Sequence, residues 1–430
     1  MTSNRWIVLV AFAYMLSIGM ALPIYAGSVV NTSMVVDLSW DRQTLGLLVG
    51  ANMIVNGLLA PGGAWVVQRL GVRHTLIGGA VLMALVSVAL ATVVTQPWQA
   101  ILAFGLGLGI AGNLTGIIAC QTGVAQWFDE QRTTALSLLY AAMGIGGFAS
   151  VWIVTRVIES MQDWRAGWWV FAAASAAGAI VATLVIRNRL DEHGKMAGPG
   201  APVAPKGGAT AHGVDESLTL AGALRSPFLW AVCLCMLAST SAAAFVVAHV
   251  QAYLRDLGFS PTGAASAVSL FSLATLGGNL AVGPIAARFS PRVAYAAALG
   301  TLALAMFILV NVQGSATLYA FAVIAGIGFG ASQVGSMAIL GHYWSTRLFP
   351  ALTAMGLLIQ TAGGGAVPII AGAYFDANHS YTAILLAIVI ANIVGATVLM
   401  LARLPARSTI AAEHGADAPP FDLSAQQPGF

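Results

Sequence analysis

The sequence predicts an all-α integral membrane protein with twelve transmembrane helices, arranged as two pseudo-symmetric six-helix bundles. Composition is the first observation behind this prediction. Of the 430 residues, 58% are hydrophobic and only 8% are charged, whereas roughly a quarter of the residues in an ordinary soluble domain are charged. Inside lipid only helices and closed barrels satisfy every backbone amide, and the chain lacks the polar alternation of a membrane barrel. A series of apolar runs and an internal repeat are the other two observations.

Apolar runs long enough to span a bilayer, about 20 residues each, recur along the chain. Charged residues or Pro, Gly and Asn bound each run, and each run is interpreted as one helix. The first set of predicted helices covers residues 5–30, 43–67, 74–94, 98–126, 134–156 and 166–187. The second set covers residues 227–251, 262–287, 293–312, 317–342, 350–374 and 380–403. We therefore expect an N-terminal bundle over 1–187 and a C-terminal bundle over 227–403.

The connection between the two sets is polar. Residues 188–226 contain AGPGAPVAPKGGATAHG, a Gly/Pro/Ala-rich stretch with too little apolar surface to fold alone. This composition predicts a cytoplasmic linker between the bundles. Residues 404–430, which include APPFDLSAQQPGF, are predicted to be a disordered cytoplasmic tail for the same reason.

The basic residues predict the orientation in the membrane. With the amino terminus inside, all but four of the 18 Lys and Arg residues lie in cytoplasmic connections, and the exceptions are Arg42, Arg156, Arg165 and Arg255. Cytoplasmic loops of membrane proteins carry such an excess of Lys and Arg. We therefore expect a multi-pass protein of a cell membrane, a bacterial inner membrane, with both termini in the cytoplasm.

Several function classes do not fit the sequence. The net charge of +3 comes from basic residues scattered in short connections, without the basic stripe of a nucleic-acid-binding protein. Cys120, Cys233 and Cys235 lie inside apolar runs and supply too few ligands for a metal. No HExxH or GxSxG motif is present, so catalysis of those types has no support. We expect no enzyme, no cofactor, no metal site and no nucleic-acid partner.

Landmarks of the first half recur in the second half. Arg69 and Arg73 recur as Arg288 and Arg292, each 219 residues later. The aromatic residues at the ends of the fourth and tenth predicted helices are separated by nearly the same number of residues. Repeats with the same orientation are typical of secondary transporters.

The loop after the second predicted helix resembles that of the major facilitator superfamily, which carries G-x-x-x-D-[RK]-x-G-x-[RK]. The matching positions are Ala64, Gln68, Arg69, Gly71 and Arg73. Pro61-Gly62-Gly63, Trp127-Phe128 and Arg132 are most similar to the monocarboxylate and oxalate/formate branch. The resemblance implies two bundles that rock about a site near the middle of the membrane, a mechanism called alternating access.

The resemblance also implies a gating motif. In relatives, the acid of this motif pairs with basic residues and helix ends and latches the cytoplasmic side shut. Gln68 stands at the position of that acid here, and because glutamine lacks a charge-assisted contact we predict a weakened latch. The alternative is that Gln68 only caps the second helix. The expected gating residues are Gln68, Arg69, Gly71, Arg73, Arg132, Arg288 and Arg292.

The predicted helix centres contain no ionisable carboxylate, lysine or arginine. All 15 acidic residues lie in connections or tails, and a charge at the middle of the bilayer costs at least about 2.5–3.5 kcal/mol. Carboxylate carriers of the resembled branch place an Arg or Lys in helix eight, eleven or one, whereas helix eight here has Ser269, Ser272, Thr275 and Asn279. Either neutral donors and half-helix ends hold an anion, or the substrate is neutral, zwitterionic or largely apolar.

Polar side chains within reach of the central cavity of that fold are candidate substrate-binding residues. Counting about 1.5 Å per residue from each helix boundary selects Tyr14, Ser17, Asn52, Asn56, Asn113, Tyr140, Ser239, Asn279, Gln333 and Gln360. Asn52 and Asn56 are four residues apart, so both amides share one helix face. The alternative is that these side chains join packed membrane helices.

His249, near the outer end of helix seven, is the candidate residue for proton coupling, because a histidine changes charge close to neutral pH. It lies four residues from both Phe245 and Tyr253, on one helical face. The alternative is that His249 is a hydrogen-bonded structural residue.

We therefore expect a secondary active or facilitative transporter that moves a small organic solute by alternating access, acting as a monomer in the lipid bilayer. The expected substrate is a small organic monocarboxylate or a related neutral or zwitterionic compound, with a co-transported proton or a counter-substrate as a further partner. One alternative is an exporter of an amphipathic or aromatic compound, as in drug efflux. The alternative from another class is a gated channel or a membrane sensor.

Overall fold

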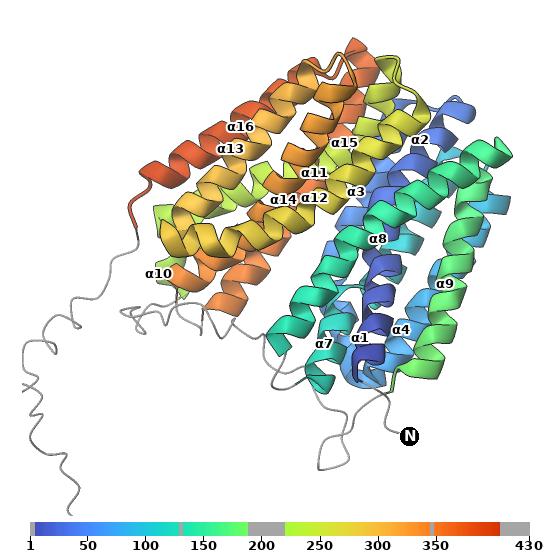
Figure 1. The fold of residues 1–430 in the computed structure, drawn as a ribbon, viewed down its shortest axis with the longest axis horizontal. Coiled ribbons are helices and arrows are strands. Elements are labelled where there is room, and N and C mark those ends of the chain that lie inside the picture. The colour runs from blue at the N-terminus through green and yellow to red at the C-terminus, as the bar shows by residue number, and fades with distance from the viewer. Residues whose placement is uncertain (1–4, 129–131, 188–219, 345–347, 405–430) are drawn as a thin grey trace, which may run out of the picture.

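The computed structural model describes residues 5–128, 132–187, 220–344 and 348–404. Every element of this part of the chain is a helix. Figure 1 shows one group of helices from the first half of the chain, in blue to green, beside a second group in yellow to red. The prediction of an all-helical membrane fold is therefore confirmed. Most of the predicted linker and tail lies outside the described residues.

Successive membrane-spanning segments alternate in direction along each half of the chain (Figure 1). The elements of the first half, with π-helical segments written η, are α1 (Arg5–Leu16), η1 (Ser17–Ala26), α2 (Gly27–Asp37), α3 (Arg42–Leu58), α4 (Ala60–Thr92), α5 (Pro97–Ala100), η2 (Ile101–Leu108), α6 (Gly109–Thr115), α7 (Ile117–Trp127), α8 (Arg132–Met161) and α9 (Arg165–Val185). The elements of the second half are α10 (Leu220–Leu224), α11 (Pro227–Asp256), α12 (Pro261–Arg288), α13 (Pro291–Val310), α14 (Ser315–Tyr343), α15 (Phe349–Asn378) and α16 (Thr382–Leu401).

Eleven helices in the described residues are long and apolar enough to cross a membrane, compared with the twelve expected. The difference lies in the predicted helix 43–67, which is divided at Leu59 between α3 and the start of α4. The predicted boundary between the second and third helices falls inside α4, where Gly71 has φ 79° and ψ 163°. Only glycine adopts such a conformation readily, so Gly71 joins two helices without an intervening loop. One further difference is the short helix α10, inside the stretch expected to be an unstructured linker.

Two of the membrane-spanning segments, which we call rods, are irregular inside a predicted helix. The first rod runs from α1 through η1 to α2, and Pro23 lies within η1, where its missing N–H and its ring disfavour regular α-helix. The fourth rod is interrupted at Gly116, whose ψ of −156° separates α6 from α7. A Cβ atom at Gly116 would lie 3.3 Å from the Met20 Sδ atom of η1. The break therefore lies at the contact between the first and fourth rods.

The two halves meet along α3 with α15 and along α8 with α12. Gly46 of α3 packs against the Pro368 carbonyl of α15, and Gly50 packs against Gly365, so closely that a methyl group at either glycine would overlap the facing backbone. Small residues of this kind allow membrane helices to approach. The interface between the halves thus depends on backbone contact rather than on large side chains.

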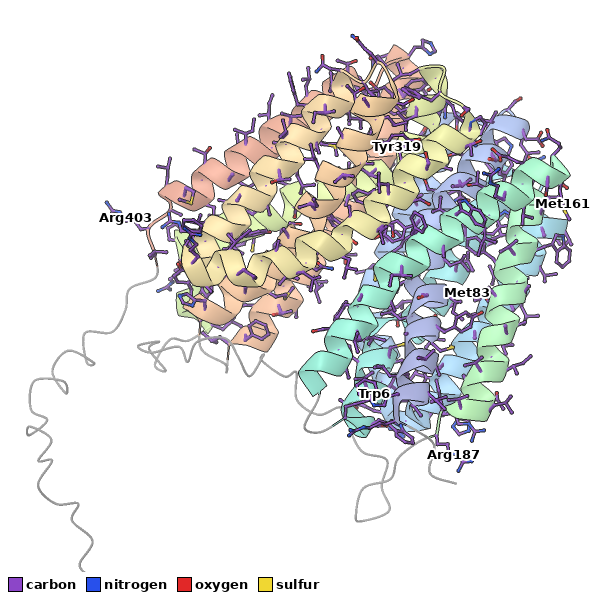
Figure 2. All side chains as sticks on the ribbon, viewed as in Figure 1. Trp6, Met83, Met161, Arg187, Tyr319 and Arg403 are labelled. Atoms are coloured by element: carbon purple, nitrogen blue, oxygen red, sulfur yellow. The ribbon has the colours of Figure 1, made fainter. Side chains whose placement is uncertain are left out.

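The contacts between the halves lie toward one end of the molecule. We define the closed side as the side on which α2, α8 and α11 end, and the linker side as the side on which α1 begins and α16 ends. The two groups of helices lie together on the closed side and spread apart toward the linker side (Figure 1). Figure 2 shows Trp6 and Arg187 at the linker side of the first half and Met161 at its closed side.

Candidate functional site

Charged residues join the two halves on the closed side. The Arg42 guanidinium lies 2.6 Å from the Asp256 carboxylate. The Asp376 carboxylate at the end of α15 accepts hydrogen bonds from the backbone N–H groups of Arg42 (3.0 Å) and Gln43 (2.8 Å), so an acid from one half caps the first turn of a helix in the other. Arg255 donates to the Ser33 hydroxyl at 3.1 Å. These contacts belong to the conformation in which the closed side is sealed.

Serines of α12 extend this seal toward the middle of the membrane. Ser269 donates to the Phe148 carbonyl of α8 at 3.0 Å, and Ser272 donates to the Gly144 carbonyl at 3.1 Å. The sequence indicated that neutral hydroxyls stand at the helix-eight positions where relatives carry a cation. In the structure these two hydroxyls bond to the backbone of the opposite half, which explains why they are neutral, small donors.

The halves separate beyond two contact points. Gly57 of α3 packs on Thr361 of α15, and Leu58 and Leu357 further toward the linker side are 60% and 48% exposed. On the other flank, the Gly144–Ser272 contact is followed by Tyr140, which is 38% exposed. We call the region between these two points and the linker side the parting zone.

Several of the predicted binding residues form hydrogen bonds within their own half. Asn52 donates to the Phe104 carbonyl of η2 at 2.9 Å, and Asn113 donates to the Asn56 carbonyl at 2.9 Å. These bonds fit the alternative in which amides join packed helices. Tyr14 donates to the Ala174 carbonyl of α9, and Ser17 donates to two carbonyls, Ala13 of its own rod and Ala142 of α8. Ser239 is buried and donates to Met236 within α11.

Four other predicted binding residues leave their polar groups at the surface of the helices. Tyr140 and Gln333 are exposed, and Asn279 and Gln360 are half-buried. The side-chain amides of Asn279, Gln333 and Gln360 have no hydrogen-bond partner among the described residues. Tyr140 has one partner, because Gln121 of α7 donates its Nε2–H to the Tyr140 hydroxyl. Gln121 was not among the predicted residues, although it is a polar residue in the mostly apolar helix α7.

The break at Gly116 creates a helix end inside the fourth rod, next to Met20 of η1. The first amide groups of a helix have no partner within that helix, and the helix dipole makes this end positive. The helix α7 that begins here contains 11 residues, and Gln121 lies in its second turn. A half-helix end near neutral side chains is one of the two arrangements that the sequence left open for an uncharged route.

His249 lies in the closed-side wall rather than in the parting zone. It is fully buried, with its Nε2 atom 2.8 Å from the Pro368 carbonyl of α15 and its Nδ1 atom 3.0 Å from the Tyr381 hydroxyl. Burial raises the pKa of Tyr381, so this hydroxyl stays protonated and donates to Nδ1. The Phe245 ring packs at 5.7 Å, as the helical spacing predicted. The role of His249 in proton coupling stays a prediction.

The motif arginines cap helices at the linker side. Arg73 donates to the Thr183 carbonyl near the end of α9 at 2.7 Å. Its repeat equivalent Arg292 donates to the Leu399 carbonyl at 2.9 Å and to the Ala402 carbonyl at 2.8 Å, at the end of α16. A guanidinium at a helix C-terminus satisfies free carbonyls and the negative end of the dipole. Each duplicated arginine therefore ties the last helix of its half to the loop that carries the motif.

The other motif residues form no such bonds. Arg69 and Arg288 are exposed and lie over the Trp65 and Phe289 rings at 5.5 Å and 5.6 Å. Gln68 is exposed and its side chain has no partner among the described residues, so neither the latch nor the cap predicted for it is seen in this conformation. The side chain of Arg132 lies outside the described residues.

Asp, Glu, Lys and Arg residues in the described spans lie near helix ends. Arg42, Arg255, Asp256 and Asp376 belong to the closed side, and Arg73 and Arg292 to the linker side. The parting zone is therefore lined by neutral polar and apolar side chains among the described residues.

Comparison with known proteins gives a consistent result. The sequence profile of the Major Facilitator Superfamily matches residues 7–253 and 229–426. Monocarboxylate transporter 13 of Rattus norvegicus is 27% identical over 335 residues, covering 75% of this chain and 72% of that protein. Monocarboxylate transporter 13 of Bos taurus is 28% identical over 231 residues, covering 52% of this chain and 48% of that protein.

Two solved structures share the fold. The nucleoside transporter NupG has a TM-score of 0.73 at 14% identity, covering 92% of this chain and 99% of that chain. A bacterial homologue of the human lysosomal transporter Spinster, solved inward-facing and occupied, has a TM-score of 0.69 at 15% identity, covering 93% and 97%.

Proposed function

This chain belongs to the Major Facilitator Superfamily of secondary transporters, and from that premise we propose that it moves a small organic monocarboxylate, or a related neutral or zwitterionic solute, by alternating access. The solute binds in the parting zone. Side chains from both halves contact it there, which lets one bound molecule hold the two halves together while they rock. A site shared between repeats near the middle of the membrane is the arrangement this mechanism requires.

One observation carries the proposal: polar side chains at the helix surfaces of both halves make no hydrogen bond to the opposite half, and those of the second half have no partner at all among the described residues. Tyr140 and Gln121 come from the first half, and Asn279, Gln333 and Gln360 come from the second. Neutral amides and hydroxyls both donate and accept hydrogen bonds, so they suit a small polar organic solute. The partial identity to monocarboxylate transporter 13 of rat supports a monocarboxylate as the first compound to test.

We further propose that the linker side faces the cytoplasm. Arg69, Arg73, Arg288 and Arg292 all lie on that side, in line with the excess of basic residues in cytoplasmic loops. The conformation with a sealed closed side is then open to the cytoplasm. Release of the contacts of Arg42 with Asp256 and Asp376 accompanies the switch to the opposite conformation.

Uptake into liposomes tests the proposed function. The purified protein is reconstituted and supplied with radiolabelled monocarboxylates, amino acids and amphipathic aromatic compounds, first alone and then with unlabelled compound inside. The proposal requires saturable uptake of a monocarboxylate or a zwitterion and acceleration by the internal compound. Non-saturable flux without counterflow would instead indicate a channel. Transport of the aromatic compounds alone would indicate the efflux alternative.

A further inference from the structure

We propose that Gln121 and Tyr140 together bind the uncharged form of the solute, a protonated carboxylic acid or a primary carboxamide, in preference to a carboxylate. The proton that accompanies an acid then crosses the membrane on the solute. This inference rests on the proposed function, because it assumes that a small organic acid is carried. It names the form of the solute that the site accepts and two residues that select it.

The position of the pair follows from the contacts between α8 and α12. Ser269 of α12 bonds with Phe148 of α8, and Ser272 bonds with Gly144. A higher residue number on α12 is therefore paired with a lower residue number on α8. The two helices are therefore antiparallel. Tyr140 lies one turn beyond Gly144, toward the linker side, on the stripe of α8 that faces α12. Tyr140 is thus the first large side chain past the sealed layer on this stripe of α8.

The hydrogen-bonding groups of the pair are complementary to an uncharged acid. The Tyr140 hydroxyl accepts from Gln121 Nε2–H, which leaves the tyrosine O–H free to donate. Gln121 Oε1 has no donor among the described residues and remains free to accept. The pair thus offers the tyrosine O–H and the second Gln121 Nε2–H as donors, and Gln121 Oε1 as an acceptor. A carboxylic acid or a primary amide offers both an acceptor and a donor, whereas a carboxylate has acceptors only and would leave Gln121 Oε1 without a donor.

The charge distribution favours the same form of the solute. A carboxylate that leaves water without a cation to pair with loses a large hydration free energy. None of the described Lys or Arg side chains lies at the level of the pair, since Arg73 and Arg292 bond to helix ends at the linker side. Arg132 lies eight residues before Tyr140 on α8, about 12 Å along the helix axis. The neutral solute avoids this penalty.

The second half offers a matching group. Asn279 lies one turn beyond Thr275 on α12, and Thr275 and Ser272 both contact Gly144. In the antiparallel register, Asn279 is therefore the position that faces Tyr140. Its side-chain amide has no partner among the described residues, and an amide again supplies both a donor and an acceptor. A solute bound to Gln121 and Tyr140 is within the reach of Asn279 when the halves close on the linker side.

The proton needs no titrating residue in this scheme. His249 is buried in the closed layer with both ring nitrogens engaged. The described charge that acts on His249 is Arg42, and its partner Tyr381 is also influenced by Asp256 and Asp376. No described carboxylate lies at the level of Gln121 and Tyr140. The acid R–COOH enters with its O–H bond intact, crosses, and dissociates into R–COO⁻ and H⁺ in the water on the other side. One proton moves with each acid, and no protein bond forms or breaks.

The test compares acids of different strength with an amide. Reconstituted protein is supplied with carboxylic acids of similar size whose pKa values differ by about one to two units, and with the primary amide of one of them. We expect the pH of half-maximal uptake to shift with the pKa of each acid, and amide uptake to be independent of pH. Flux into protein-free liposomes is subtracted, because neutral acids also diffuse through lipid. The pattern should persist in His249→Gln.

Variants of the pair test the two residues. Tyr140→Phe removes the donor and Gln121→Leu removes the acceptor, and each should raise KM for both the acid and the amide about fivefold to tenfold, the loss of one hydrogen bond. Tyr319→Phe is the matched control, since Tyr319 is 43% exposed near the closed side (Figure 2). Its KM should equal that of the unmodified protein.

Three outcomes would overturn the inference. The first is one pH midpoint shared by all the acids. The second is loss of the pH dependence in His249→Gln, which would assign proton coupling to the histidine. The third is saturable uptake of acids without any uptake of the amide. If neither acids nor amides show saturable uptake, the proposed function itself fails.

Discussion

His249 connects three helices of the closed side. Its Nε2–H donates to the Pro368 carbonyl of α15, and its Nδ1 accepts from Tyr381, which precedes α16. The same Pro368 carbonyl is the point at which Gly46 of α3 packs. A single buried side chain of α11 therefore fixes the backbone position against which the other half of the molecule is sealed.

Replacing His249 by Ala should destabilise the protein. The change leaves the Pro368 carbonyl and the Tyr381 hydroxyl buried without partners, and each unsatisfied buried group costs about 1–3 kcal/mol. His249→Gln keeps one polar group within reach and should lose less. Thermal unfolding of both variants in detergent checks this order. A melting temperature of His249→Ala equal to that of the unmodified protein would show that the histidine bonds contribute nothing to the fold.

Substitution of Gly46 should affect the closed side specifically. A methyl group there overlaps the Pro368 carbonyl, so Gly46→Ala should force α3 and α15 apart and lower the population of the conformation described here. Gly62→Ala is the matched control, because nothing lies within 4 Å of a Cβ atom at that position. Distances between spin labels on Gln43 of α3 and Ala377 of α15, which are exposed on the closed side, should lengthen in Gly46→Ala and not in the control. Equal distances in both would contradict the prediction.

The orientation of polar side chains was the part of the site that the sequence could not predict. Depth along a helix follows from counting residues, and it placed Asn52, Asn113 and Tyr140 within reach of the central cavity expected for this fold. The direction in which a side chain points around the helix axis can be predicted only from an amphipathic pattern. Helices that are apolar on every side have little such pattern. Asn52 and Asn113 therefore turned out to bond to backbone carbonyls inside their own half, whereas Tyr140 is 38% exposed.

At the scale of elements, the sequence predicted most helices and missed their interruptions. Charged residues, prolines and glycines predicted the ends of the long helices α11 to α16 to within a few residues. The breaks at Leu59 and Gly116 both lie in apolar runs where glycine is frequent. At Gly116, nothing in the sequence distinguishes the glycine that leaves helical geometry from neighbouring glycines that keep it. The repeat was more informative. Arg73 and Arg292 occupy equivalent caps because duplicated halves must each end a helix at the same place.

Loss of the caps should loosen α9 and α16. Arg73→Gln removes a charge-assisted bond to Thr183, and Arg292→Gln removes those to Leu399 and Ala402. A cation at a helix C-terminus contributes about 0.3–1 kcal/mol, so each variant should unfold at a lower temperature and exchange amide hydrogens faster at the capped end.

The exposed arginines of the same motif are the controls for these caps. Arg69→Gln and Arg288→Gln remove equal charge from the same loops without breaking a helix cap. Their hydrogen exchange at the ends of α9 and α16 should match that of the unmodified protein. Faster exchange in all four variants would mean that net charge, and not capping, determines the stability of these helix ends.

At the scale of the whole molecule, the arrangement of contacts predicts from which side of the membrane water has access to each residue. Leu357 of α15 lies one turn beyond the Gly57–Thr361 contact, toward the linker side, and is 48% exposed. Leu257 follows α11 on the closed side and is 46% exposed. The three native cysteines are buried, so a thiol introduced at either leucine is the main target for a membrane-impermeant reagent.

Cysteine labelling in oriented vesicles checks both the orientation and the conformation. Leu357→Cys should react only when the reagent is on the cytoplasmic face, and Leu257→Cys only when it is on the opposite face. A transported solute should slow the reaction at Leu357→Cys, because closure on the linker side brings α3 and α15 together there, and should leave Leu257→Cys reactive. Labelling of Leu357→Cys from the opposite face would reverse the proposed orientation. Labelling of both positions from both faces would mean that the two halves do not seal, which a transporter working by alternating access requires.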